Sequence, residues 1–393
     1  MPFAVVLLLG VACGDDEVTA PDGGDGTAPT LDAIFPVGAS VGANLTLRGQ
    51  NFGTTGTVSF GNVTVSSFTL WSESKIGVVV PLLDPPNVTE VDVTVAVAGK
   101  SSNAVTFTRE AAGVTRLTRD GYTNWQACWA GNSTIFFASN RGGNFNIWYF
   151  DDDGDHLTQR TSFATGDTDM PATDVATLYY RSSHDGDWDI YSSSGPGAEL
   201  RLTSTPEKDF EIAVSGPLGP YRFAISRAEA FNGGTIWNIW GHGSTGWAQI
   251  SDQHADFHPT FSPNGQHVAF MNKAGDWVPG QIVVVATLGG GPVPISDPTE
   301  NCAYPAWNPV YDVIAYTRSS AGKRNVFACE QDGTNEVQLT DFWTDVLYPA
   351  WAPDGRRLAY TAFVSGSYEL FVADVGSALR GAGVGPASPG AVP

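Results

Sequence analysis

The chain has 393 residues, longer than one ordinary small domain, which predicts two or three folding units. Acidic residues outnumber basic ones by 41 to 20, giving a formal charge of -21. A nucleic-acid backbone or an anionic membrane surface would be repelled by this charge, so we expect no nucleic-acid partner. Gly (45) and Pro (25) are abundant and Met (3) is rare, which favours short strands joined by tight turns. We therefore predict an all-β protein.

The first thirteen residues, MPFAVVLLLGVAC, form an apolar run that ends in small residues and Cys13. The run is too short to cross a bilayer as a folded helix but suits the apolar segment of a secretory signal. It resembles a bacterial lipoprotein signal, which implies lipidation of Cys13 and a place in the cell envelope, in the periplasm, at the outer membrane or at the cell surface. A buried N-terminal strand is the alternative. Residues 14–28 are acidic and Gly-rich, as expected of a linker behind a lipid anchor.

Residues 29–110 alternate apolar and polar positions in short bursts punctuated by Gly and Asn. This pattern predicts about seven strands in a small β-sandwich. The segments PTLDAIFPVGASVGANLTLRGQNFG, VSFGN, VVVP and SSNAVTFT resemble the IPT/TIG domain, an immunoglobulin-like sandwich. The resemblance implies a spacer or binding module without chemistry of its own. Within it, Gly49, Asn51 and Gly53 are expected to form turns and Phe52 to anchor the core.

A different pattern follows, in which short strands end in Leu-Thr or a near equivalent. Each ending is followed by an acidic linker, a strand such as YPAW, an apolar strand such as VIAYTR, and a third strand such as NVFACE. Units of this length with four strands each predict a six-bladed β-propeller over residues 114–375. The last unit lacks its outer strand and the first begins with a surplus one, so residues 114–118 should complete the sixth blade and close the ring. The endings fall at Thr118, Thr161, Thr203, Ser251, Ser296 and Thr340, 42 to 48 residues apart.

The repeat also carries a family resemblance. YPAWAPDGRRLAYTAF, HPTFSPNGQHVAFMN and SNRGGNFNIWYF resemble the repeat of TolB-type propellers. TolB proper has a different N-terminal domain, so its role with the Tol-Pal system is not implied. We expect Pro305 and Pro349 at the first residue of their strands, Trp307 and Trp351 in the wedges between blades, and a disordered tail over residues 376–393.

Carboxylates recur in the linkers that should border one mouth of the propeller channel. Converging carboxylates bind hard cations such as Ca²⁺ and attract basic groups. Alternatively, each one caps its own turn by accepting hydrogen bonds from backbone amides. The seven predicted channel-mouth residues are Asp167, Asp169, Asp209, Glu211, Asp256, Glu300 and Asp345.

One linker, QHADFHP, combines histidines with a carboxylate. His254, Asp256 and His258 alternate, so in an extended segment they would share a face and could bind a metal ion. Exposed loop histidines are the alternative. The remaining cysteines, Cys128, Cys302 and Cys329, show no Cys-x-x-Cys spacing and are expected to be buried and unpaired.

These features predict an exported, lipid-anchored binding or scaffold protein whose propeller binds a protein or peptide partner in the cell envelope. The alternative is a metal-dependent or carbohydrate-active propeller enzyme, a lyase or hydrolase, that uses the channel-mouth carboxylates with His254 and His258. A purely structural envelope component is a third hypothesis. No cofactor is expected beyond Ca²⁺ or another divalent cation at these residues, and no Gly-x-Ser-x-Gly elbow of an α/β-hydrolase is present. The oligomeric state is not indicated.

Overall fold

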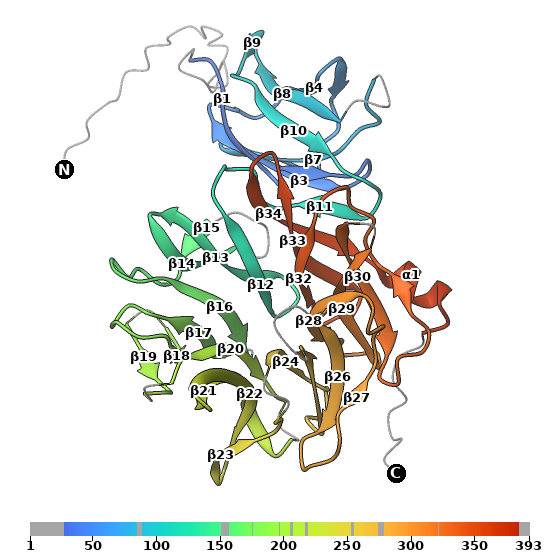
Figure 1. Ribbon diagram of the computed structural model, residues 1–393. Helices are drawn as coiled ribbons and strands as arrows, with labels where there is room; N and C mark the ends of the chain where they lie inside the picture. The colour runs from blue at the N-terminus through green and yellow to red at the C-terminus, as the bar shows by residue number, and fades with distance from the viewer. Residues whose placement is uncertain are drawn as a thin grey trace, which may run out of the picture.

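The computed structural model describes residues 27–84, 89–150, 157–174, 176–195, 197–204, 207–216, 219–252, 255–273, 279–320 and 322–384. A small β-sandwich lies against one side of a ring of β-sheets (Figure 1). The predicted signal, its Cys13, most of the linker and His254 lie outside the described residues. In the part of the chain that the structure describes, no helix is long and apolar enough to cross a membrane.

The sandwich packs two sheets around one apolar core. Phe52, Phe60 and Phe107 are fully buried in it, and Phe60 and Phe107 meet edge to face with ring centroids 5.9 Å apart. One sheet has the order β1 (Thr30–Phe35), β3 (Asn44–Gln50), β7 (Lys75–Val79), β6 (Leu70–Trp71). The other contains β2 (Gly38–Ala39), β10 (Val105–Arg109), β8 (Glu90–Val97), β4 (Thr57–Phe60) and β5 (Val63–Val65), with β9 (Lys100–Ser101) beside β8.

The Gly-x-Asn-Phe-Gly segment forms the turn predicted for it. A Cβ on Gly49 would lie 1.8 Å from the Thr30 carbonyl oxygen and 2.5 Å from the Phe52 ring, so only glycine fits there. Asn51 and Gly53 have φ angles of 59° and 58°, in the left-handed region that these residue types tolerate best. The turn thereby places the Phe52 ring in the core.

Six blades form the propeller, as the repeat predicted (Figure 1). The innermost strands are β12 (Asn124–Ala130), β16 (Thr168–Thr173), β20 (Asp209–Val214), β24 (Asp256–Phe261), β28 (Asn301–Trp307) and β32 (Val346–Trp351). The second strands are β13 (Thr134–Gly142), β17 (Leu178–Ser182), β21 (Tyr221–Phe231), β25 (His267–Asn272), β29 (Val313–Ser320) and β33 (Arg357–Val364). The third are β14 (Asn144–Phe150), β18 (Asp189–Ser193), β22 (Gly234–Gly243), β26 (Gln281–Ala286), β30 (Lys323–Glu330) and β34 (Ser367–Asp374). The outer strands are β15 (Leu157–Gln159), β19 (Glu199–Arg201), β23 (Gly246–Gln249), β27 (Val293–Pro294), β31 (Val337–Gln338) and β11 (Val114–Arg116).

Strand β11 closes the ring. It pairs antiparallel with β34, placing Val114 opposite Ala373 and Arg116 opposite Phe371, so the first propeller strand completes the last blade as predicted. The same strand also pairs with β2 of the sandwich, and one sheet therefore runs from blade 6 into the sandwich. The Phe35 ring lies 5.3 Å from that of Phe150 in blade 1. The sandwich is thus attached to the propeller by backbone pairing and by side-chain packing.

The recurring Leu-Thr ending has a structural cause. In every blade the hydroxyl of the Thr or Ser accepts a hydrogen bond from a backbone N–H of the third strand, at 2.8 to 2.9 Å. The hydroxyl therefore continues the ladder where the short outer strand ends, and leaves no buried N–H unpaired. The pairs are Ile147 with Thr161, Ile190 with Thr203, Ile239 with Ser251, Ile282 with Ser296, Val326 with Thr340 and Leu370 with Thr118.

Tryptophans fill the wedges between blades, as predicted. Trp351 donates its indole N–H to the Ala306 carbonyl of blade 5 at 3.0 Å, and Trp129 donates to Ala350 of blade 6 at 3.1 Å. Trp307 is equally buried. Cys302 and Cys329 are free and buried in one apolar cluster, and burial raises their thiol pKa values to about 11 and about 12.

The described part of the tail, up to residue 384, differs from the prediction of disorder over residues 376–393, whereas residues 385–393 lie outside the described residues. Residues Gly376–Gly381 form helix α1. Leu379 and Val384 are buried against the apolar cluster of the last two blades. A short apolar pair at this spacing gains stability only because the propeller supplies a surface to cover, so its helix was not recognisable in isolation.

Candidate binding site at the propeller channel

A β-bulge interrupts every innermost strand. At each bulge one non-glycine residue has a positive φ, between 43° and 56°, a conformation uncommon for residues with a side chain. Each register shift falls at the same place, and the bulge turns that side chain out of the ordinary alternation of the strand. The six bulge residues are Gln126, Met170, Glu211, His258, Tyr304 and Tyr348.

The bulges also explain the recurring prolines. In four blades the residue after the bulge residue is proline, where the missing N–H costs no ladder hydrogen bond. The prediction that Pro305 and Pro349 begin their strands was wrong, because β28 and β32 start four and three residues earlier, at Asn301 and Val346. The bulge, which a sequence pattern does not show, is what permits proline inside the strand.

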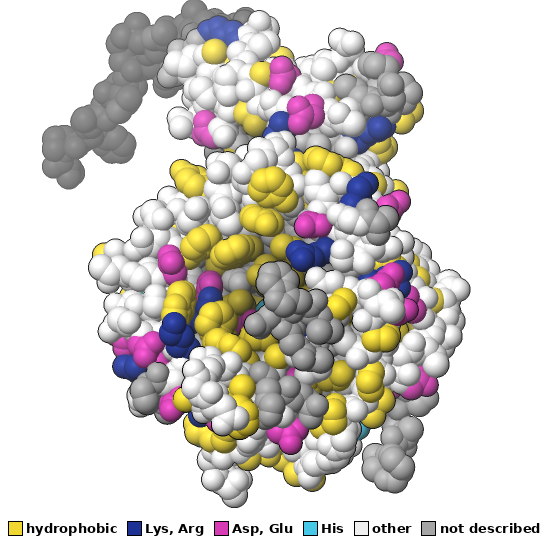
Figure 2. Space-filling view, viewed as in Figure 1, with side chains coloured by type: hydrophobic (Ala, Val, Ile, Leu, Met, Phe, Trp, Pro, Cys, Tyr) yellow, Lys and Arg dark blue, Asp and Glu magenta, His cyan; other side chains and the backbone are white. Residues whose placement is uncertain are grey.

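Together the bulge residues line a cavity at the centre of the ring, with a volume of about 130 Å³. Each innermost strand contributes its bulge residue and the residue after it, so the cavity is the propeller channel. Hydrophobic side chains gather on the propeller face seen in Figure 2. The residues that follow the bulge residues in the lining are Ala127, Pro171, Ile212, Pro259, Pro305 and Pro349.

Glu211 and His258 contact each other across two blades in this lining. The His258 Nδ1 lies 2.7 Å from Glu211 Oε1, and the backbone N–H of His258 donates to Glu211 Oε2 at 2.6 Å. The Ser226 hydroxyl donates to the same Oε2 at 3.0 Å. Burial alone raises the pKa of Glu211, but the charge of His258 and these hydrogen bonds outweigh burial and hold the pKa below its ordinary value.

The other side of the cavity is aromatic. The Tyr304 ring centroid lies 4.3 Å from that of His258 and 4.2 Å from that of Tyr348. Burial raises the pKa values of both tyrosines. Gln126 Oε1 accepts the backbone N–H of Met170 at 3.1 Å. Polar and aromatic side chains therefore follow one another around the ring.

Further aromatic rings extend outward from the channel between blades 1 and 6. Trp125 stacks on Phe145 with centroids 4.9 Å apart, and lies 6.1 Å from Tyr368 and 6.3 Å from Tyr348. Phe363, which is 43% exposed, packs against Tyr368. These five residues, Trp125, Phe145, Tyr348, Phe363 and Tyr368, are called the aromatic collar below.

Among the described tryptophans, Trp343 is the most open to solvent. It is 64% exposed and stacks on Phe342. Trp247 is half-buried against Phe223, and Trp277 lies outside the described residues.

The predicted channel-mouth carboxylates are mostly engaged in their own blades. Asp169 pairs with Arg181 on the adjacent strand through two hydrogen bonds, of 2.8 and 2.6 Å, and both side chains are buried. The Arg181 guanidinium lies between the rings of Trp188 and Phe210, at 4.0 and 3.9 Å. Burial raises the pKa of Asp169, although Arg181 opposes the shift. Such a pair fixes the start of the innermost strand.

Asp209 and Glu300 follow the same pattern. Asp209 is fully buried and pairs with Arg227 at 2.8 Å, while Glu300 pairs with Arg318 at 2.6 Å. Asp256 accepts from Ser251 at 2.5 Å and from Asn272 at 2.8 Å.

Asp167 and Asp345 accept backbone N–H groups of the preceding blade. Asp167 accepts that of Phe145 at 3.0 Å, and Asp345 accepts that of Arg324 at 2.9 Å. Of the seven predicted residues, only Glu211 lines the cavity.

The proposed metal ligands are not brought together where they are described. Asp256 bonds within blade 4, whereas the bulge turns His258 toward Glu211 of blade 3. His254 lies outside the described residues. Elsewhere in the described ranges, no group of three or more His, Cys, Asp or Glu side chains could hold a metal ion. The expectation that the three residues share an extended face fails for Asp256 and His258 because of the bulge.

Sequence reasoning missed four of the six bulge residues in the channel, Gln126, Met170, Tyr304 and Tyr348, whereas Glu211 and His258 were among the predicted site residues. The signal was present, since the letter before each recurring Pro, in MPATD, HPTF and the two YPAW segments, varies from Met to His to Tyr. A position that varies within an otherwise constant repeat is a candidate for binding. In the Tyr-Pro-Ala-Trp motif the Trp is buried between blades, whereas the Tyr lines the channel.

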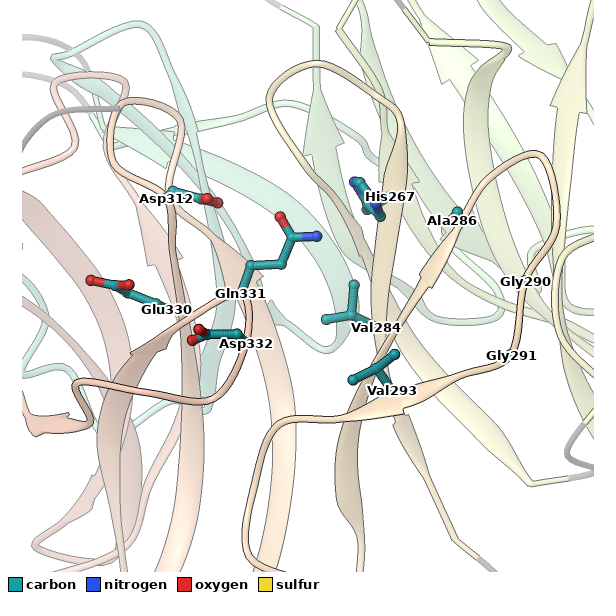
Figure 3. A pocket seen from close by; sticks show the side chains of 10 residues that line it. All are labelled: His267, Val284, Ala286, Gly290, Gly291, Val293, Asp312, Glu330, Gln331 and Asp332. Atoms are coloured by element: carbon teal, nitrogen blue, oxygen red, sulfur yellow. The ribbon is translucent and has the colours of Figure 1, made fainter. Parts of the chain in front are cut away.

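A second hollow lies between blades 4 and 5, away from the channel residues (Figure 3). Its volume is about 500 Å³. The floor is apolar, with Val284 and Val293, and Gln331 faces His267 across it. Three carboxylates, Asp312, Glu330 and Asp332, lie on the blade 5 side.

Comparison with known proteins identifies the class of each unit. Residues 29–108 match the family model of the IPT/TIG domain, so the sandwich is an IPT/TIG domain. No curated protein was found to match the chain by sequence.

Solved structures similar to this chain include several propellers. A gluconolactonase from Xanthomonas campestris has a TM-score of 0.51 and 14% identity, over 66% of this chain and 88% of that one. TolB from Acinetobacter baumannii has a TM-score of 0.49 and 14% identity, over 72% and 76%. An oligogalacturonate lyase in complex with manganese has a TM-score of 0.49 and 14% identity, over 73% and 97%. At these identities the likeness concerns the fold alone, which proteins of different function share.

Proposed function

We propose that this protein is an exported, lipid-anchored binding protein of the bacterial cell envelope, whose propeller binds a protein or peptide partner at the channel. The observation that carries the proposal is the combination of a channel cavity with the aromatic collar beside it, which is half-buried except for the exposed Phe363. Aromatic side chains are the commonest anchors of protein interfaces because they bury large areas at a small cost in conformational entropy. The predicted lipoprotein signal at Cys13 supports the location, and the joined sheet of sandwich and propeller supports a fixed position of the binding face relative to the sandwich.

Site-specific photo-cross-linking tests the proposal. A photoreactive amino acid replaces Phe363, at the edge of the aromatic collar, in the full-length protein expressed in its own cell. A matched chain carries it at Leu288, which is 85% exposed and lies after β26 in blade 4, away from the collar. We expect a discrete cross-linked partner from position 363 and not from 288. Equal capture at both positions, or none at 363, would contradict the proposal.

The anchor is tested separately. Cells are labelled with a radioactive fatty acid, and the wild-type chain should incorporate label that Cys13→Ala abolishes. Equal labelling of both chains would exclude lipidation at this residue.

A second candidate function, catalysis, is favoured by one observation. Glu211 orients His258 by accepting from its Nδ1 side, and the Nε2 has no partner among the described residues. A carboxylate that orients an imidazole is an arrangement used in general-base catalysis. Release of reducing ends from polysaccharides by the purified protein, absent in His258→Asn, would establish this function. Equal release by both proteins would assign the activity to a contaminant.

A further inference from the structure

We infer that the channel accepts one basic side chain of the partner, a lysine ammonium or an arginine guanidinium, with Glu211 as its counter-charge and His258 as its hydrogen-bond acceptor. The inference rests on the proposed function and names the chemistry of the ligand at that site. It was reached from the lining of the cavity, which combines one carboxylate, one imidazole and two phenol rings.

The lining of the cavity carries a negative charge when His258 is neutral. Among the described residues that line the cavity, Glu211 is the only acidic one and none is Lys or Arg. The carboxylate accepts from the Ser226 hydroxyl, the His258 backbone N–H and His258 Nδ1. When the imidazole is neutral, all of these donors are neutral and the pair has a net charge of −1. Among the described residues the cation that acts on the lining is Arg324, which acts on Tyr304 from outside the cavity and is paired with Asp345. An anionic ligand would be repelled, and a neutral one would leave this charge uncompensated.

The hydrogen-bonding capacity is the second step. Because Nδ1 of a neutral imidazole must carry the proton to donate to Glu211, Nε2 is an acceptor. Beside it stand Tyr304 and Tyr348, whose faces attract cations. An acceptor, a net negative charge and aromatic faces are the combination that an ammonium or guanidinium group requires.

The size of the cavity is the third step. Its volume of about 130 Å³ corresponds to roughly four water molecules at about 30 Å³ each. This volume suits the end of one extended side chain. The aromatic collar outside it could then contact the backbone and neighbouring residues of the partner.

The hollow between blades 4 and 5 provides a matched control for the charge of Glu211 (Figure 3). This hollow also carries carboxylates, including Asp312. They lie in and beside turns at the edge of the propeller and not in the lining of the channel. Glu211→Gln and Asp312→Asn change the net charge of the chain equally. If binding depends only on the overall charge of -21, the two variants should behave alike.

The experiment measures binding of two small probes to the full chain at pH 8 by calorimetry. The probes are N-acetyl-lysine N-methylamide and the norleucine analogue, which has the same chain without the ammonium group. We expect the lysine probe to bind at least about tenfold more tightly, a difference worth about 1.4 kcal/mol. Glu211→Gln should remove most of this preference and Asp312→Asn should not. Equal binding of the two probes, or an equal loss in both variants, would overturn the inference.

A second variant covers a failure of Glu211→Gln to fold. Tyr304→Leu removes an aromatic face without changing the charge. It should weaken the lysine probe several-fold and leave the norleucine probe unchanged, and an unchanged lysine affinity would count against the inference. Cross-linking at Phe363 is read independently. If a partner is captured there but the channel does not prefer the lysine probe, the proposed function stands. Only the inference that the partner inserts a basic side chain is then overturned.

Discussion

The carboxylates at the beginning of the innermost strands, called the entry carboxylates below, lie one to four residues before the bulge residues. The two kinds of residue make different contacts. Asp209 and Glu211 make the contrast within a single strand, β20. Asp209 is fully buried and paired with Arg227 of its own blade, whereas Glu211 faces the channel and pairs with His258 of the next blade. A carboxylate near the channel mouth is therefore no indication of a channel ligand; its position relative to the bulge decides which way it points.

The predicted carboxylates illustrate why this position matters. Asp209 and Asp256 stand two residues before the bulge residue and Asp169 one residue before it, and each accepts from the adjacent strand of its own blade. Asp256 also accepts from Ser251 of blade 3. Asp167 and Asp345 stand three residues before it and bond to a neighbouring backbone. What looked like one acidic rim is a set of different local contacts.

The largest effect is expected when the ion pair of an entry carboxylate is broken. Asp209→Ala leaves the buried Arg227 guanidinium without its counter-charge, which should cost about 3–5 kcal/mol in the free energy of unfolding. Urea denaturation measures it. A loss below about 1 kcal/mol would mean that the entry carboxylates do not support the blades.

Removing the hydroxyl that follows an outer strand should lower the free energy of unfolding by a smaller amount. Thr340→Val removes the hydroxyl that accepts the Val326 N–H and leaves that buried N–H unpaired. We expect a loss of about 1–3 kcal/mol, with Thr340→Ser close to wild type because it keeps the acceptor. If valine and serine are equally tolerated, the hydroxyl does not contribute as described.

The channel pair predicts a dependence on acid. The pKa of Glu211 is lower in the folded chain than in the unfolded one, so its contribution is complete above the unfolded pKa, near 4.3, and is lost as the pH falls through the folded value. Wild type should lose stability more steeply below about pH 4.5 than Glu211→Gln, by about 1.4 kcal/mol for each pKa unit of depression. Parallel curves from thermal melts between pH 3 and pH 7 would exclude this contribution.

The smallest change in the free energy of unfolding is expected at a partly exposed entry carboxylate. Asp345 is 45% exposed and lies 3.9 Å from Arg324. Asp345→Asn keeps an acceptor for the Arg324 N–H and should change the free energy of unfolding by less than about 1 kcal/mol. A loss as large as that of Asp209→Ala would show that burial is not what separates the two positions.

Much of the architecture could be predicted because it repeats. Period-two alternation revealed the strands, and the recurrence of Leu-Thr revealed the blades. The surplus strand at residues 114–118 was assigned correctly because an open ring would leave unpaired edges. Trp307 and Trp351 were placed correctly because a large apolar side chain that recurs at the end of an innermost strand is buried most readily against the neighbouring blade.

The site could not be predicted in the same way. A bulge moves one side chain out of the alternation, and no residue type marks it, since the bulge residues range from Met to Glu to Tyr. The arginine partners of the entry carboxylates lie 12 to 18 residues away along the chain and were not assigned. Neither was the pairing of β2 with β11, because strands of two and three residues leave almost no sequence signal.

The sequence by itself determined an IPT/TIG sandwich, six blades and the closure of the ring, because these follow from local hydrogen-bonding and burial patterns that each segment carries. The tertiary structure alone decided which side chains meet in the channel. That meeting joins Gln126, Glu211, His258, Tyr304 and Tyr348 from five different blades, and depends on backbone bulges whose conformation is fixed only when neighbouring blades pack together.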